Sequence, residues 1–475
     1  MPLIFHTTRL FGILVLSAVV LKHATSLAST SSPSRPPIVI AGAGPASLVF
    51  AQRHLRNDPN AVIHIYEQRA QPPRYSTQDE QENGSLVAGD FAFGFGLTTR
   101  GLRALDQVPG LKDAVLDISR QSMTGTFMTN RRDMCAEMIY KLQQDFGDSE
   151  RLKFHFESKV TGLVMEKDGG KSSSNMHTGG KVLVENRRDG SVEEREYSLL
   201  VAADGTNSNI RKDLVAMNEI KGKRYYNSLS WKALQLPAQP NIIPGGFLSH
   251  QGKGNNELCF VTPRYKDRFV LMFYRFNRKD PKEQANIMDA TTVDELKEAI
   301  VKMFPNITHF PPDAVAERFL SKPPGQEVYM SLNRHAVPSQ KVALIGDAAV
   351  GTYVLFGHGC VSSMERANVL ADCLANSTSV ADDSDYDNCL STALETFSKE
   401  SVKEGTAISD LNVISHILRN HLFRDRALKV RSKIQTYLVE KPEVPYSEIL
   451  QERDVKWTIR LSKVFWRFSR RKAQL

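Results

Sequence analysis

Three short stretches of the chain are apolar, apart from a lysine at the start of the third, and each runs directly into a turn of small residues. A strand that is apolar throughout is typical of a parallel sheet buried on both faces. The carboxyl ends of such strands gather at one edge of the sheet, where ligands bind. The strands and their turns are Ile38–Ala41 with Gly42-Ala43-Gly44, Leu199–Ala203 with Asp204-Gly205, and Lys341–Ile345 with Gly346-Asp347-Ala348.

The pattern around the first turn predicts a dinucleotide-binding unit. Gly42 permits a tight turn, and Gly44 lets a diphosphate approach the backbone where the next helix begins. Ser47 stands where the usual pattern has a third glycine. The strand Val62–Tyr66 leads into Glu67, 23 residues after Gly44, where a carboxylate can bind a ribose hydroxyl. The alternative is an ordinary strand–loop–helix junction that binds no ligand. The helix, the second strand and the acidic residue all lie at the expected positions, and this favours a nucleotide-binding site.

The amino-acid composition of the chain changes in the region from Tyr225 to Arg275. This region is rich in residues that favour β-strands. Leu258–Thr262 and Phe269–Phe276 flank a short polar turn, so they predict a hairpin in a separate antiparallel sheet. Helical patterns fill most of the chain after this region. The predicted fold class is therefore α/β: a doubly wound, Rossmann-like domain with an inserted antiparallel-sheet domain and a helical C-terminal region.

Composition and charge limit the classes of function that the protein can have. The chain of 475 residues is 41% apolar and 24% charged, as is ordinary for a globular protein. Its net charge is +8, and residues 401–475, with 16 Lys+Arg and 8 Asp+Glu, carry all of it. A neutral body with a basic tail does not indicate a nucleic-acid partner. The five cysteines form no CxxC pair, so neither a disulfide framework nor a metal site is predicted.

The basic tail contains a predicted amphipathic helix with two open interpretations. Its apolar face would bind the surface of an anionic membrane, with the cations assisting. Alternatively, the same face docks the helix on the protein and leaves the cations in water. The residues expected on that face are Trp457, Leu461, Val464, Phe465 and Phe468.

The N-terminus reads as a targeting segment. The apolar run Leu10–Leu21 follows Arg9 and is too short to span a membrane comfortably. It fits a secretory signal, so the protein is predicted to be located in the secretory pathway or at the endoplasmic-reticulum membrane. A mitochondrial or plastid presequence is the alternative, because no acidic residue precedes Asp58. A short signal anchor is a third possibility.

Four stretches together resemble one enzyme family, the FAD-dependent aromatic hydroxylases, which are single-component flavoprotein monooxygenases. Ala202–Arg211 is similar to the second FAD motif of that family, and Leu344–Ala349 is similar to the third. Arg131 matches the arginine on a helix that contacts FAD, and Leu97–Leu105 matches a further family stretch. The resemblance implies that NADPH or NADH reduces bound FAD, and that O2 then serves to hydroxylate a small aromatic substrate.

The resemblance also implies the site residues and domain boundaries. His358, in a turn beside the flavin, is the candidate for proton transfer, with a solvated loop histidine as the alternative. The implied FAD-binding residues are Gly42, Gly44, Ala46, Ser47, Glu67, Arg131, Asp204, Gly205, Gly346, Asp347, Ala348, Gly357 and Gly359. The predicted parts are 1–37 (signal or targeting segment with linker), 38–217 and 331–375 (FAD-binding domain), 218–330 (substrate-domain sheet) and 376–475 (helical C-terminal region with the basic tail).

Two positions depart from the family pattern. Val350 stands where the family usually has His, and Val361 stands where a relative has Asn. Two other functions stay open. The first is a different FAD oxidoreductase, such as a reductase or dehydrogenase. The second, which these departures permit, is a flavin-binding protein without catalytic activity.

Overall fold

The computed structural model describes most of the chain after residue 34. The described ranges are 35–74, 94–122, 126–164, 178–237, 239–240, 248–251, 257–263, 269–276, 287–378, 385–418, 423–469 and 471–473. The chain divides into two units, Met1–Pro36 and Pro37–Leu475, and the second contains every element below. The predicted targeting segment lies outside the described residues, and its destination stays a prediction.

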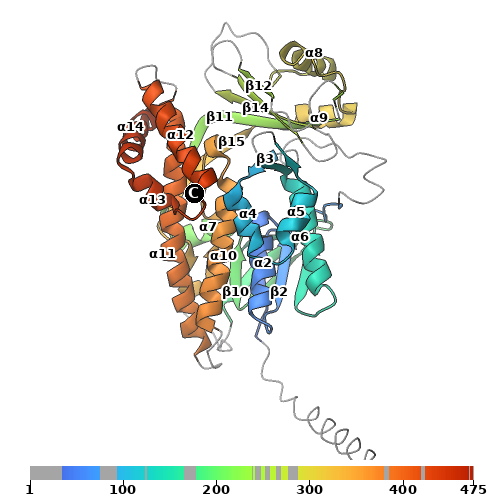
Figure 1. Ribbon diagram of the computed structural model, residues 1–475. Coiled ribbons are helices and arrows are strands. Elements are labelled where there is room, and N and C mark those ends of the chain that lie inside the picture. Colours follow the sequence, from blue (N-terminus) through green and yellow to red (C-terminus); the bar gives the residue numbers. More distant parts are fainter. Residues whose placement is uncertain are drawn as a thin grey trace, which may run out of the picture. The chain divides into compact units, whose positions relative to one another are not determined.

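A six-stranded sheet forms the centre of the nucleotide-binding half, in the order β16-β17-β10-β1-β2-β6 (Figure 1). The strands from β17 to β6 pair in parallel, and β16 adds an antiparallel edge. Their bounds are β1 Ile38–Ala41, β2 Ile63–Glu67, β6 Leu152–Phe156, β10 Leu199–Ala202, β16 Ala336–Val337 and β17 Val342–Leu344. The three predicted apolar strands are confirmed as neighbours in one sheet.

Both faces of this sheet are buried, as its apolar strands require. In β1, Ile38 and Ile40 belong to one hydrophobic core, while Val39 and Ala41 belong to the other. The first core packs under α2 (Pro45–Asn57), α4 (Thr99–Asp106), α5 (Leu111–Asp117), α6 (Arg131–Phe146) and α10 (Gly359–Thr378). The second packs against β7 (Ser158–Leu163), β8 (Gly180–Asn186), α7 (Asn209–Ala216) and C-terminal helices. Strand β9 (Val192–Tyr197) joins β7 and β8 in a small three-stranded sheet. Strands β3 (Gly94–Leu97), β5 (Phe127–Asn130) and β4 (Arg120–Gln121) form another.

The predicted second sheet is present and antiparallel. Its order is β12-β13-β14-β11-β15, with β18 also paired to β11. The bounds are β11 Gly222–Leu236, β12 Leu248–Gln251, β13 Glu257–Pro263, β14 Phe269–Phe276, β15 Gly325–Leu332 and β18 Arg471–Ala473. The predicted hairpin is confirmed as β13 and β14. Helices α8 (Val293–Met303) and α9 (Asp313–Ser321) pack on the sheet through a core that includes Phe273 and Phe319. The predicted boundary at residue 330 falls inside β15.

The C-terminal region is helical, and its last helix docks on the protein. The elements are α11 (Tyr386–Asn412), α12 (Arg424–Glu440), α13 (Tyr446–Gln451) and α14 (Arg453–Ser469). The predicted apolar face of α14 is wrong in part, because Trp457 and Val464 are exposed, whereas Leu461 and Phe465 pack against the second core. The buried residues are Val455, Thr458, Ile459, Ser462 and Trp466. Among the described residues, no helix is long and apolar enough to cross a membrane. Contact with a membrane surface therefore stays a prediction.

A buried polar network joins α13 to the nucleotide-binding half. The Arg100 side chain on α4 donates from Nε to Glu365 Oε1 on α10 at 2.6 Å, and from Nη2 to the Val444 carbonyl at 2.8 Å. Its guanidinium lies 4.1 Å from the ring centroid of Tyr446, whose hydroxyl donates to the other Glu365 oxygen at 2.8 Å. Arg100 is only 4% exposed, so these partners replace its contacts with water.

Replacing Arg100 with Met is expected to lower the free energy of unfolding by about 3 kcal/mol, because Oε1 of Glu365 and the carbonyl of Val444 lose their donor. Chemical denaturation with circular dichroism measures the loss. Lys112→Met is the matched control, since the Lys112–Asp106 ion pair is exposed and contributes little. Equal stability of the two variants would show that the network does not hold the C-terminal region.

Candidate functional site

One large cavity meets all three strand-end turns. Its volume is about 730 Å³, and residues of the nucleotide-binding half and of the second sheet both line it. Twelve of the predicted FAD-binding positions lie on its wall. They are Gly42, Gly44, Ala46, Ser47, Glu67, Arg131, Asp204, Gly205, Gly346, Asp347, Gly357 and Gly359. Ala348 is not on the wall, because it is fully buried in the core under the third turn.

The first turn is built so that a ligand can approach the backbone. Gly42 has φ +97°, and a Cβ there would lie 2.6 Å from the Ala203 carbonyl oxygen, so only glycine fits between β1 and β10. A Cβ on Gly44 would meet only the Arg131 guanidinium, at 3.9 Å. Helix α2 begins at Pro45 with no side-chain cap, which leaves its first N–H groups available to an anion.

The carboxylate of Glu67 is held in place beside this turn. Its Oε2 accepts a hydrogen bond from the Ala43 N–H at 3.0 Å, and its Oε1 accepts one from the Arg69 N–H at 3.0 Å. Each carboxylate oxygen can still accept a second hydrogen bond. Glu67 therefore fixes the turn and also fits the predicted contact with a ribose hydroxyl.

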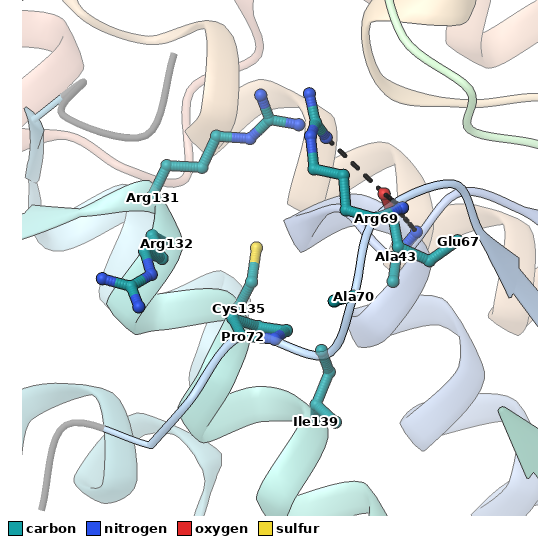
Figure 2. A pocket seen from close by; sticks show the side chains of 9 residues that line it. All are labelled: Ala43, Glu67, Arg69, Ala70, Pro72, Arg131, Arg132, Cys135 and Ile139. Carbon is teal, nitrogen blue, oxygen red and sulfur yellow. Dashed lines mark hydrogen bonds and ion pairs between the residues drawn. The ribbon is translucent and has the colours of Figure 1, made fainter. Parts of the chain in front are cut away.

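Arginines bring positive charge to the same end of the cavity. A smaller hollow of about 70 Å³ shares Glu67, Arg69 and Arg131 with the large cavity (Figure 2). Figure 2 shows the side chains of Arg131 and Cys135 reaching this hollow from α6, and that of Arg69 from the chain just after β2. Cations beside a glycine turn and a helix N-terminus favour binding of a diphosphate.

The second turn supplies a carboxylate that is only partly used within the protein. Asp204 Oδ2 accepts a hydrogen bond from the Asn209 N–H at 2.8 Å at the start of α7, as a turn-stabilising aspartate would. Its Oδ1 is buried and has no hydrogen-bond partner within the described part of the chain. Burial raises the pKa of Asp204. An unpartnered buried oxygen at the cavity wall fits a ligand hydroxyl as donor.

A buried arginine joins the second turn to the third. Arg211 has no exposed surface, and it donates from Nη1 to the Ala348 carbonyl at 2.9 Å and from Nη2 to the Thr206 carbonyl at 2.6 Å. Burial lowers its pKa to about 10, with a further decrease from nearby Arg224. The sequence pattern included Arg211 in the second motif but did not predict this bridge.

Asp347 presents its carboxylate to the cavity from the third turn. The preceding Gly346 has φ +61°, a conformation that favours glycine. The Asp347 side chain is exposed to the cavity, and Oδ2 accepts a long hydrogen bond from the Thr206 hydroxyl at 3.4 Å. The surrounding protein raises the pKa of Asp347 by desolvation, and the charges of Arg131 and Arg211 oppose this shift. The carboxylate is placed to accept hydrogen bonds from a ligand.

The structure does not support the predicted role of His358. Its side chain is 1% exposed and is absent from the cavity wall, while its neighbours Gly357 and Gly359 line the cavity. The imidazole packs edge-on against Tyr446, with ring centroids 6.3 Å apart. Burial lowers the pKa of His358 to about 3, so the ring is neutral at physiological pH. The alternative of a solvated loop histidine is wrong as well.

The two departures from the family pattern are core positions. Val350 packs against α11, where a Cβ on Gly405 would lie 2.5 Å from its Cγ2. Val361 is fully buried against Gly101 of α4. Neither residue lines the cavity, so the substitutions fill space between helices.

The remaining wall comes from the second sheet and from the chain after the third turn. Trp231 on β11, residues 326–328 on β15 and residues 351–354 line this part. The Tyr353 hydroxyl accepts a hydrogen bond from Trp466 Nε1 at 2.9 Å, so α14 supports this wall from behind. Of the aromatic side chains on this sheet, Trp231 lines the cavity, whereas Phe273 lies in the core under α8 and α9. No sequence pattern indicated the contribution of β15.

Comparisons with known proteins agree with this geometry. No protein-family model matches the chain. Kynurenine 3-monooxygenase 2 of Aspergillus niger is 23% identical over 418 residues, or 79% of this chain and 80% of the relative. Kynurenine 3-monooxygenase of Salinispora tropica is 25% identical over 359 residues, or 71% and 72%. A crystal structure of 2-methyl-3-hydroxypyridine-5-carboxylic acid oxygenase superimposes with a TM-score of 0.57 at 16% identity, covering 85% of this chain and 98% of that chain.

The predicted family resemblance is confirmed. The chain is similar in sequence to kynurenine 3-monooxygenases, and it shares the predicted fold class with the pyridine-carboxylate oxygenase. The predicted enzyme class, an FAD-dependent NAD(P)H monooxygenase, agrees with these relatives. The individual site residues and domain boundaries stay predictions, supported by the geometry of the cavity.

Proposed function

We propose that the protein is an FAD-dependent monooxygenase that uses NAD(P)H and O2 to hydroxylate a small aromatic substrate. The observation that carries this proposal is the continuity of the cavity. It runs from the three nucleotide-binding turns to a wall formed by Trp231 of the second sheet and by Tyr353 of the chain after the third turn. A cofactor and an aromatic substrate can therefore meet in one cavity.

The residues present fit FAD. The N-terminus of α2 and Arg131 would hold the diphosphate, and Glu67 would accept a hydrogen bond from the adenosine ribose. Asp347 would accept one from the ribityl chain, beside the unpartnered oxygen of Asp204. When bound and reduced, FAD supplies the activation of O2. The protein contributes by holding the cofactor, excluding bulk water and orienting the ring to be hydroxylated.

The reaction class can be tested with three outcomes. NADPH oxidation coupled to O2 uptake, both accelerated by an aromatic substrate, supports a monooxygenase. Turnover that continues without O2 would indicate a different FAD oxidoreductase. A bound flavin that neither NADPH nor NADH ever bleaches would indicate a protein without catalytic activity. Comparison of the two nucleotides in the same assay decides which one serves as co-substrate.

We expect kynurenine not to be the main substrate, although the similar enzymes are named for it. The α-carboxylate of kynurenine would need a cationic or multi-donor partner in a site that excludes water. In the described part of the cavity wall, the second sheet and residues 351–354 contribute no Lys or Arg. Kynurenine should therefore leave the rate of NADPH oxidation close to its basal value. Strong acceleration with formation of the 3-hydroxy product would contradict this expectation.

A further inference from the structure

The last turn of α11 carries three buried polar side chains, Ser409, Asp410 and Asn412, which form its polar end. The Ser409 hydroxyl lies 3.0 Å from the carbonyl oxygen of Gly351, which lines the cavity, and equally far from a carbonyl of its own helix. Asn412 Oδ1 accepts a hydrogen bond from the Phe356 N–H at 3.2 Å. Buried polar groups need such partners, so these contacts favour one position of the chain after the third turn.

The carboxylate of Asp410 joins the second sheet to α14. Its Oδ1 accepts a hydrogen bond from the Tyr329 hydroxyl on β15 at 3.0 Å. Its Oδ2 accepts one from Nζ of Lys463, a partly exposed residue of α14, at 2.6 Å. Burial raises the pKa of Tyr329, and the Asp410 charge raises it further, so the hydroxyl stays protonated and remains a donor. Asp410 is therefore held from two sides.

Tyr329 belongs to the part of β15 that forms the cavity wall. Residues 326–328 line the cavity directly before it. The next residue, Met330, donates its N–H to the Gly351 carbonyl at 3.0 Å, which joins β15 to residues 351–354 of the same wall. Both segments of this wall therefore contact the polar end of α11.

Helix α14 contacts the same wall a second time. Lys463 and Trp466 are three residues apart and lie on one side of the helix. Trp466 Nε1 donates to the Tyr353 hydroxyl at 2.9 Å, and its ring centroid lies 4.6 Å from that of Tyr329. The helix thus supports the wall directly, and also through Asp410.

We propose that the polar end of α11 positions the wall formed by β15 and residues 351–354, and that α14 supports it through Lys463. Asp410 is a positioning residue, because it acts through Tyr329 and is not among the residues that line the cavity. This inference rests on the proposed function, in which the wall orients the aromatic substrate and limits the access of water to bound FAD. Loss of the hydrogen bond between Tyr329 and Asp410 lets the wall move and lets solutes reach the flavin.

Tyr329→Phe removes the hydroxyl and keeps the ring, and Tyr437→Phe is its matched control. The Tyr437 hydroxyl also donates to a carboxylate that a lysine binds, because Glu452 accepts from Tyr437 and from Lys433 at 3.1 Å each. None of these three residues is among those that line the cavity. The control therefore removes the same kind of hydrogen bond from a more exposed place, where it contributes little.

Backbone hydrogen exchange, read by mass spectrometry, measures the wall directly. We expect residues 325–332 and 351–356 to exchange about tenfold faster in Tyr329→Phe, because a hydrogen bond to a carboxylate is lost. Iodide quenching of bound FAD, at constant ionic strength, measures access to the flavin, and its constant should rise at least about threefold. Tyr437→Phe should match the wild type in both measurements. Wild-type exchange or wild-type quenching in Tyr329→Phe would overturn the proposal.

Two further variants separate the hydrogen bond from the charge. The amide oxygen of Asp410→Asn can still accept from the Tyr329 hydroxyl, so exchange in the wall should stay close to the wild type. Asp410→Ala should behave like Tyr329→Phe. Equal effects of Asn and Ala would overturn the role of the hydrogen bond. If the Ala variant does not fold, Asp410→Asn must still exchange more slowly in the wall than Tyr329→Phe.

Hydrogen exchange needs neither FAD nor turnover, so the two proposals can fail separately. A protein that binds no flavin would remove the proposed function, and exchange in the wall would still decide the role of Asp410. A flavin that NADPH reduces, with equal exchange in Tyr329→Phe and Tyr437→Phe, would leave the proposed function and remove this inference.

Discussion

Replacing Arg211 with Met is expected to abolish FAD binding and to lower the free energy of unfolding by about 3 kcal/mol. The guanidinium joins the carbonyls of Thr206 and Ala348, so it fixes the second strand-end turn against the third. Met fills much of the volume but donates no hydrogen bond, and both carbonyls lose their donor in a region without water. The turns that carry Asp204 and Asp347 would then no longer be held together.

Urea denaturation and FAD titration followed by flavin fluorescence measure the two effects. The matched control is Arg188→Met, because Arg188 lies on the surface with its side chain 74% exposed. The control should match the wild type in both assays. Wild-type affinity for FAD in Arg211→Met would show that the bridge is not needed to form the site.

Replacing Asp347 with Ala is expected to weaken FAD binding by about 10- to 150-fold while the fold remains stable. A hydrogen bond to a charged group contributes about 1.5–3 kcal/mol, which converts to that range of affinity. The Asp347 carboxylate is open to the cavity and has only the long contact with Thr206. Surrounding protein raises its pKa, so removing the charge costs the fold itself little.

Asp347→Asn is the informative partner variant, because its amide keeps one acceptor oxygen and should bind FAD with intermediate affinity. Asp313→Ala on α9 removes an exposed carboxylate far from the three turns and serves as the control. Fluorescence quenching of FAD gives all four dissociation constants, and thermal denaturation of the apo forms checks the fold. An unchanged dissociation constant in Asp347→Ala would exclude this residue from the FAD site.

The sequence predicted the elements whose signals are local. An unbroken apolar run identifies a doubly buried strand, and a Gly-x-Gly pattern directly after it identifies a tight turn. The strands β1 and β10 and the turn at Gly42 could therefore be predicted without other parts of the chain. The parallel edge that gathers the three turns follows from a general rule of such sheets. For this reason the three turns reached one cavity, whereas Arg131, Gly357 and Gly359 had been implied only by the family resemblance.

Contacts between distant segments could not be predicted in this way. The sequence predicted one apolar face for α14, to contact either a membrane or the protein, and that face held the large apolar residues. The buried face instead includes Thr458 and Ser462, and the Ser462 hydroxyl donates to the Thr458 carbonyl at 2.8 Å. Small residues let that helix approach closely, and Trp466 is buried because Tyr353 offers its indole N–H an acceptor. The catalytic role predicted for His358 is not supported for a similar reason. Only the position of Tyr446 shows which side of the turn the His358 ring occupies.

The absorption spectrum of the purified protein, recorded without O2 before and after addition of NADPH, tests the central claim most directly. The account predicts a bound flavin with its oxidised absorption bands, loss of those bands after NADPH is added, and their return when O2 is admitted. NADH in a parallel sample identifies the preferred nucleotide. A protein that is colourless as purified and does not quench the fluorescence of added FAD would contradict the account.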